Sequence, residues 1–303
     1  MHAIAIPYLL AVGGLLAVQA AANVQLSAAM RSPFAASTLQ LAIGALVLLL
    51  AAAAAGTLGA LGLIPDARPV ELVGGLASAL YITAGIVLFP RLGAVVTVGL
   101  FIAGQMLASL LLDGFGWLGV AREAPGVSEL LGAAAVIAGT ALIVRAQAGG
   151  ERLARSGWLA LALVAGAVLP VQGAINAQLR SALDAPVTVG AFSFVVATLA
   201  MAVALAVSLA ISSRRPRVAP LRRVPWWGWL GGLCGATYVT SVFLLIPEIG
   251  AAPTIALTVA GQQLASLVVD RYGLLRLPRR PLPAARLAGI GVLLAGVTLI
   301  QVA

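Results

Sequence analysis

The sequence is poor in charge and in the residues that build catalytic or metal centres. Only 9% of its 303 residues are charged, against about 25% in soluble domains, and it contains no lysine, so all 18 cationic side chains are arginines. The single cysteine, Cys234, excludes an internal disulfide, and the single histidine, His2, cannot by itself form a histidine-based metal or acid-base site. We therefore expect no metal ion, no cofactor and no redox chemistry.

Apolar residues make up 62% of the chain. They form blocks of about 20 residues, the length that a helix needs to cross the hydrocarbon core of a bilayer. Short segments rich in Arg and Pro separate the blocks. We therefore predict an all-α integral membrane protein. The first block has no basic segment before it and is repeated in mid-chain, so we expect a retained helix rather than a cleaved signal peptide.

The sequence contains an internal repeat. VQAAANVQLSAAMRSP, which begins at Val18, matches VQGAINAQLRSALDAP, which begins at Val171, at an offset of 153 residues. AGQMLASLLLDGFG, from Ala103, matches AGQQLASLVVDRYG, from Ala260, at an offset of 157 residues. We predict two homologous units, residues 1–147 and 148–303.

Each unit holds five apolar blocks, which predicts ten transmembrane helices. Because five is odd and one short link joins the units, the second unit must enter the membrane upside down, as an inverted-topology repeat. The predicted helices lie near residues 4–30, 34–55, 70–89, 94–112 and 128–144 in the first unit and 157–180, 187–211, 226–246, 251–269 and 285–302 in the second.

The arginines predict the orientation. Arg68, Arg122 and Arg180 lie on the same side as the N-terminus, and the other fifteen of the 18 arginines lie on the other side. The positive-inside rule then places both termini outside a bacterial plasma (inner) membrane and the link between the units in the cytoplasm. We expect the cytoplasmic arginine loops to contact anionic lipids, and we expect no nucleic-acid partner.

Three motifs resemble those of a known family. They are Q-x-x-x-N in the first helix of each unit, P-x-x-G-A before the fourth, and A-G-Q-x-x-A-S-L-x-x-D-x-[FY]-G within it. Together they resemble the YdcZ-type proteins of the drug/metabolite transporter superfamily, in the fused form with two antiparallel five-helix units. The resemblance covers nearly the whole chain. It implies an inner-membrane exporter whose substrate is unassigned.

The candidate site residues are polar side chains at repeat-related positions within apolar helices. An amide that faced lipid would leave its donors and acceptors unpaired, so these groups should point into the helix bundle. Spacing by four residues places a Gln, a Ser and an Asp along each of the fourth and ninth helices. The predicted substrate-binding residues are Gln19, Asn23, Gln105, Gln172, Asn176, Gln262, Tyr81, Tyr238, Ser109 and Ser266.

Asp113 and Asp270 lie at the rims of the fourth and ninth helices, where they could couple transport to protons. No ionisable residue falls near the middle of a predicted helix, so we expect a neutral, zwitterionic or weakly charged solute. Facilitated diffusion without coupling remains open. The amides and hydroxyls could instead be interhelical glue, and the tyrosines could be packing or interface anchors.

The first functional hypothesis is a transporter that exports a small organic solute by alternating access between the two units. A non-transporting membrane assembly protein is the second, and a lipid-modifying membrane enzyme is the third, although the sequence offers no cluster of ionisable residues for one. The two units form an internal pseudo-dimer, so we expect that the protein can act as a monomer.

Overall fold

The structure is a computed structural model that describes residues 2–120, 122, 125–146, 152–211, 215–249, 251–280 and 282–301. These residues form α-helices joined by short segments that include 3-10 turns, and they contain no strand. The α-helices are α1 (His2–Met30), α2 (Pro33–Ala54), α3 (Gly75–Leu92), α4 (Ala94–Phe115), α5 (Val127–Arg145), α6 (Arg152–Leu183), α7 (Pro186–Ile211), α8 (Gly231–Ile249), α9 (Ala251–Tyr272) and α10 (Ala284–Gln301).

The helices are those of a membrane protein. Within the described residues, seven are long and apolar enough to cross a membrane, and Ala284–Ile300 forms a shorter apolar helix. Polar caps define some of the ends: Ser32 accepts a hydrogen bond from the Ala35 backbone at the start of α2, and Pro33 occupies the first turn, where no amide hydrogen is needed.

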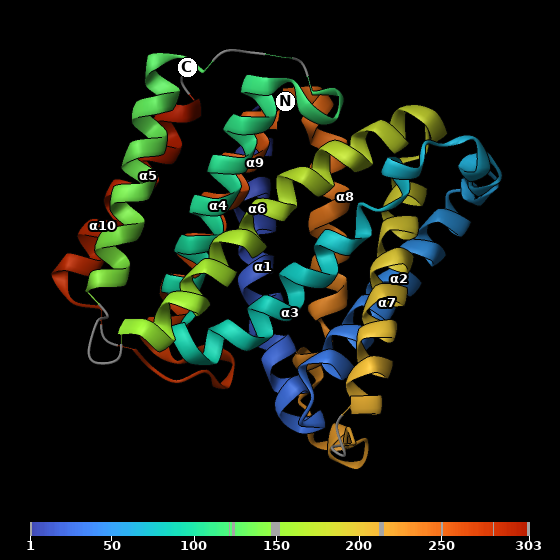
Figure 1. The fold of residues 1–303 in the computed structure, drawn as a ribbon, viewed down its shortest axis with the longest axis horizontal. Helices are drawn as coiled ribbons and strands as arrows, with labels where there is room; N and C mark the ends of the chain where they lie inside the picture. The colour runs from blue at the N-terminus through green and yellow to red at the C-terminus, as the bar shows by residue number, and fades with distance from the viewer. Residues whose placement is uncertain are drawn as a thin grey trace.

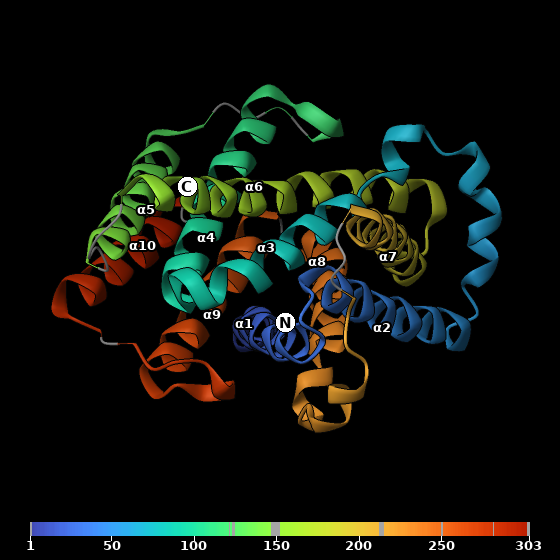
Figure 2. The same cartoon turned by 60° about the horizontal axis from the view of Figure 1, so that its bottom comes forward.

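The helices pair across the two sequence halves. α5 packs on α10 at one side of the molecule and α2 packs on α7 at the other, with the remaining helices between them (Figures 1 and 2). In the centre, α4 packs on α6 and α1 packs on α9. Exchanging each helix with its repeat counterpart therefore reproduces these four pairs.

Glycines bring the paired helices into backbone contact. A Cβ added to Gly104 of α4 would lie 2.1 Å from the Leu163 carbonyl oxygen of α6. At the matching positions, a Cβ added to Gly261 of α9 would lie 1.9 Å from the Leu10 oxygen of α1. Small residues permit this close approach of membrane helices. Four glycines have the same role where α5 meets α10: Gly132, Gly139, Gly289 and Gly296.

The turn after α4 recurs after α9. Gly116 and Gly273 both adopt a φ of +66°, which glycine tolerates best, and Leu118 and Leu275 both follow with a φ of +54°. Two glutamines hold these turns in the same way. The Gln178 amide donates to the Leu118 oxygen, and the Gln25 amide donates to the Leu275 oxygen at 3.2 Å.

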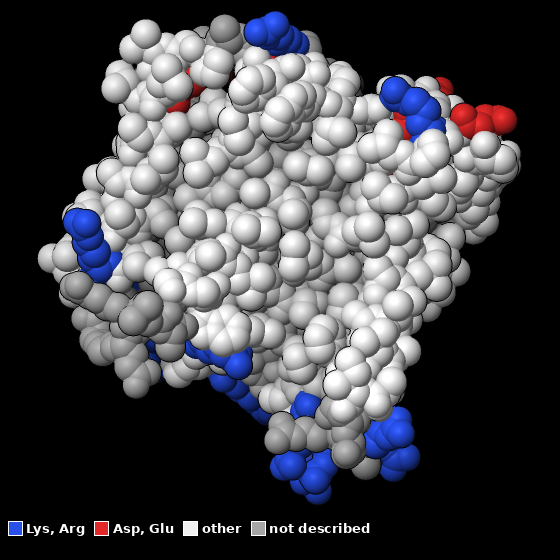
Figure 3. All heavy atoms as spheres, viewed as in Figure 1, with Lys and Arg blue, Asp and Glu red and all other residues white. Residues whose placement is uncertain are grey.

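The two ends of the bundle differ in charge. The first, which we call the arginine-rich end, carries the described residues Arg215, Arg217, Arg222, Arg223, Arg271, Arg276, Arg279 and Arg280. Basic side chains gather there at the lower edge of Figure 3. We call the other end, where α1 begins and α10 ends (Figure 1), the opposite end. It carries side chains of both signs, including Arg68, Glu71, Asp113 and Glu129.

Candidate functional site

A cavity of about 370 Å³ lies among the central helices. Its deep part is lined by polar groups of α1, α3, α4 and α6, and its outer part extends along α4 and α6 toward the opposite end. The volume is in the usual range for a small-molecule pocket. The polar lining residues are Gln19, Ser78, Tyr81, Gln105, Ser109, Asp113, Glu129, Gln172, Gln178, Ser181 and Tyr238.

The cavity contains some of the predicted site residues and not others. Seven line it: Gln19, Tyr81, Gln105, Ser109, Asp113, Gln172 and Tyr238. Five do not, and all five are buried: Asn23, Asn176, Gln262, Ser266 and Asp270. Four of these five lie on α1 or α9, on the side of the arginine-rich end. The cavity therefore lies on one side of the pseudo-symmetric bundle, away from the arginine-rich end.

Two predicted amides of α6 form hydrogen bonds with neighbouring serines. Gln172 donates through Nε2 to Ser78 Oγ at 2.7 Å and to Ser193 Oγ at 3.2 Å. Asn176 donates to the same Ser193 hydroxyl at 3.2 Å. These contacts join α6 to α3 and α7, so both amides hold helices together and Gln172 also faces the cavity.

Gln262 holds a tyrosine that lines the cavity, Tyr81. Its Nε2 donates to the Tyr81 hydroxyl at 2.7 Å, and the Tyr81 ring packs against Phe101 with the ring centroids 4.7 Å apart. Tyr81 is thus fixed at both its ring and its hydroxyl. Gln262 positions a lining residue without lining the cavity itself.

Gln105 differs from the other amides that line the cavity. It is 1% exposed and lines the cavity, and its Nε2 has no hydrogen-bond partner within the described part of the chain. An unpaired buried donor costs about 1 to 3 kcal/mol. A ligand atom that accepts a hydrogen bond would remove that cost.

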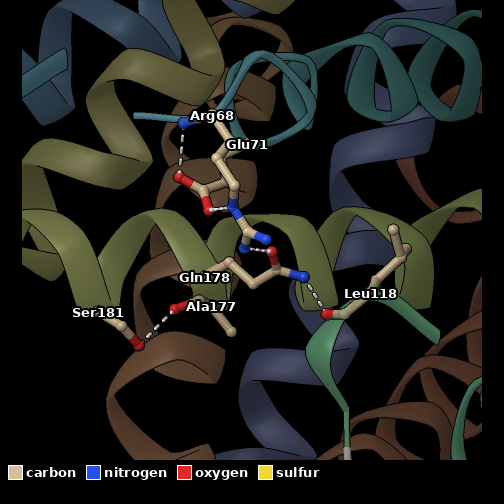
Figure 4. A network of polar contacts seen from close by, with 6 residues as sticks. All are labelled: Arg68, Glu71, Leu118, Ala177, Gln178 and Ser181. Carbon is tan, nitrogen blue, oxygen red and sulfur yellow. Dashed lines mark hydrogen bonds and ion pairs between the residues drawn. The ribbon is translucent and has the colours of Figure 1, made fainter. Parts of the chain in front are cut away.

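A chain of polar contacts fixes the rim of the cavity (Figure 4). Arg68 Nε lies 2.6 Å from Glu71 Oε1, and the guanidinium also donates to the Gln178 oxygen. Gln178 in turn donates to the Leu118 carbonyl. This chain ties the segment before α3 across α6 to the turn after α4. Both polar ends of Gln178 are used, so its role at the rim is structural.

The arginine-rich end is closed around Asp270. This carboxylate is 1% exposed and accepts hydrogen bonds at 3.1 Å from the backbone amides of Ala94 and Val95, at the start of α4. The Arg286 guanidinium lies 3.8 Å away. A carboxylate at a helix N-terminus is stabilised by the helix dipole. Arg280 donates to the Pro90 carbonyl at 3.0 Å and so ties the loop after α9 to the end of α3.

Ser78, Ser193 and Glu129 were not predicted as site residues. The repeat places Gly235 opposite Ser78 and Gln40 opposite Ser193, so neither serine has a matching hydroxyl that would have singled it out. Glu129 lines the cavity from the first turn of α5, where its Oε2 accepts a hydrogen bond from the Gly126 amide at 2.7 Å.

The repeat, the paired helices and the central cavity agree with a family match. The family model described as "Putative inner membrane exporter, YdcZ" matches residues 4–142 and again residues 157–299. The chain belongs to the YdcZ family. This membership confirms the predicted resemblance, supports a membrane transporter of the inner membrane and points away from an enzyme.

Comparison with solved structures supports the fold. One crystal structure matches with a TM-score of 0.63 at 17% sequence identity, covering 98% of this YdcZ-family chain and 97% of the other. At that identity the match carries information about the fold alone. No curated protein matches the chain.

Proposed function

We propose that this YdcZ-family protein exports a small organic solute by alternating access between two inverted five-helix repeats, residues 1–147 and 148–303. The main observation is that one cavity joins the central amides to the opposite end, while the repeat-related positions toward the arginine-rich end are buried. A transporter that opens to one side at a time has this arrangement.

The difference in burial between repeat-related residues is clearest on α4 and α9. Ser109 and Asp113 are half-buried and line the cavity, whereas their counterparts Ser266 and Asp270 are fully buried. Because the two helices have matching sequences and matching partners, exchanging their conformations would open the arginine-rich end and close the opposite end. Two packings of similar energy are what a two-state transporter needs.

The proposed sidedness follows the arginines. The arginine-rich end would face the cytoplasm and the opposite end the outside, so the structure would correspond to an outward-open state. Asp113 and Asp270, at equivalent rims, are the groups that could couple movement of the solute to protons. In this proposal Gln19, Gln105 and Gln172 bind the solute, and Gln262 orients Tyr81.

Flux through the purified protein tests the proposal. Proteoliposomes loaded with a small-molecule extract of the host cells are washed, and the retained solutes are measured by mass spectrometry. We expect at least one solute to leave faster than from liposomes that contain the Gln105→Leu variant. Gly291→Ala is the matched control, because a Cβ there meets nothing within 4 Å. Identical retention of every solute would favour an assembly protein.

A further inference from the structure

A second glutamine of α9 is buried without a polar contact. Gln263, directly after Gln262, is 0% exposed, and neither its Nε2 nor its Oε1 has a hydrogen-bond partner within the described part of the chain. A buried polar group without a partner destabilises the conformation that buries it. Gln263 therefore disfavours the conformation in which the arginine-rich end is closed.

Neighbouring polar side chains of α9 do form hydrogen bonds. Thr258 donates to the Ile255 carbonyl at 2.7 Å, and Ser266 donates to the Gln263 carbonyl at 2.8 Å. Gln262 donates to the Tyr81 hydroxyl at 2.7 Å. The Gln263 side chain alone among these four forms no hydrogen bond to the described residues. Packing of α9 in this conformation therefore does not account for an amide at position 263.

The repeat indicates where this amide would find partners. At the offset of 157 residues, Gln263 corresponds to Met106, which lines the cavity next to Gln105. Two successive positions of α4 thus face the cavity. The equivalent positions of α9 are Gln262 and Gln263. When α9 adopts the arrangement that α4 has here, both amides would line a cavity that opens to the arginine-rich end.

We infer that Gln263 lines the solute pathway when the arginine-rich end is open, and that its amide then bonds to water and to the solute. This inference rests on the proposed alternating access and adds a binding residue to the opposite state. Met106 has only a thioether, which is a weak acceptor. The solute therefore meets one more amide in the state open to the arginine-rich end than in the state open to the opposite end.

Sided labelling tests the position of Gln263. On the Cys234→Ala background, Gln263→Cys should react with an impermeant maleimide in inside-out vesicles at least about tenfold faster than Val259→Cys. Val259 is the matched control because it lies one turn earlier on α9 and is 1% exposed. Its repeat counterpart, Ile102, does not line the cavity. Val259 should therefore stay buried in both states.

Gln263→Met tests the energetic role, because Met is the residue of the first unit at this position. The substitution removes an unpaired amide from the closed end and removes its hydrogen bonds from the open end. Labelling of Ser266→Cys in inside-out vesicles should slow about tenfold, and the thermal transition should not fall. Leu264→Met, at an exposed position of the same helix, should change neither. A structural role for Gln263 predicts the reverse, a lower transition and faster labelling, and would overturn the inference.

Modification of the introduced cysteine connects the residue to transport. Proteoliposomes that contain Gln263→Cys are treated with N-ethylmaleimide, loaded with the small-molecule extract and assayed for flux as above. The treated variant should lose the flux that it shows untreated, because the adduct occupies the pathway. Treated Val259→Cys should keep its flux. Equal flux before and after modification of Gln263→Cys would place the residue outside the pathway.

The outcomes separate the inference from the proposed function. If Ser266→Cys reacts from the cytoplasmic side while Gln263→Cys reacts no faster than Val259→Cys, the end opens without exposing Gln263 and the inference is wrong. If neither Ser266→Cys nor Gln263→Cys reacts, the arginine-rich end does not open, and alternating access fails together with the inference. Labelling of Gln263→Cys without flux of any solute would uphold its position and overturn transport.

Discussion

Replacing Asp270 with Asn should open the arginine-rich end. In this structure the carboxylate accepts two backbone hydrogen bonds from the start of α4 and lies 3.8 Å from Arg286. Asn can accept through only one atom, and its amino group would face a backbone donor. The loss of a charge-assisted contact with two donors, together with the loss of the charge opposite Arg286, should destabilise the closed end by about 3 kcal/mol.

The loss of stability of the closed end determines how much the open population grows. If Asp270 is hydrated when the end is open, the substitution changes mainly the closed state, and about 3 kcal/mol corresponds to a roughly 100-fold larger open population. Ser266 is fully buried one turn before Asp270 and reports on the opening. In inside-out vesicles, Ser266→Cys on a Cys234→Ala background should react with an impermeant maleimide about 100-fold faster when Asp270→Asn is added.

The control for this prediction is Asp184→Asn, which also removes one acidic charge but at an exposed position. It should leave the labelling rate of Ser266→Cys unchanged. If Asp270→Asn leaves that rate at the level of the parent protein, the Asp270 contacts do not keep the arginine-rich end closed. If the variant unfolds, as measured by a lost thermal transition, the contacts hold the whole fold rather than one end.

Three further predictions concern packing, the deep amides and the repeat. Gly104→Ala should lower the free energy of unfolding by about 1 to 3 kcal/mol or more, because its Cβ would lie 2.1 Å from a carbonyl oxygen. Gly291→Ala should not lower it, and thermal denaturation in detergent distinguishes the two variants. Gln105→Ala should reduce flux with little loss of stability. Gln172→Ala loses its hydrogen bonds to Ser78 and Ser193 and should reduce both flux and stability. Equal losses of stability in the two variants would contradict these different roles. Residues 1–147 and 148–303 expressed separately should transport nothing alone and recover flux when expressed together, and transport by either half alone would exclude a shared pathway.

The helices could be predicted well from the sequence because each apolar block of one unit has a matching block in the other. The expected blocks at 94–112 and 251–269 correspond to α4 and α9, each a few residues longer. The third and eighth blocks begin later than expected. Pro69 and Trp226 start short 3-10 turns, and α3 and α8 begin at Gly75 and Gly231. Proline ends or starts regular helix, and glycine is a poor helix former, which explains the delay.

The site was only partly predictable. Matching sequences place Ser109 and Ser266 in equivalent positions, so a periodic pattern cannot say which of them lines a cavity in one conformation. The role of Gln262 also depended on a residue far away in the chain, Tyr81. Lone serines such as Ser78 give no periodic signal. What the sequence could indicate was the set of buried amides, since each must find a polar partner.

Reciprocal accessibility of the two ends distinguishes alternating access from a fixed pocket. On the Cys234→Ala background, Ser109→Cys and Ser266→Cys report on the opposite end and the arginine-rich end, respectively. Alternating access predicts that Asp270→Asn speeds labelling of Ser266→Cys from the cytoplasmic side and slows labelling of Ser109→Cys from the outside, because one population grows at the expense of the other. If both cysteines react from the same side, or if both rates rise together, the two ends do not alternate.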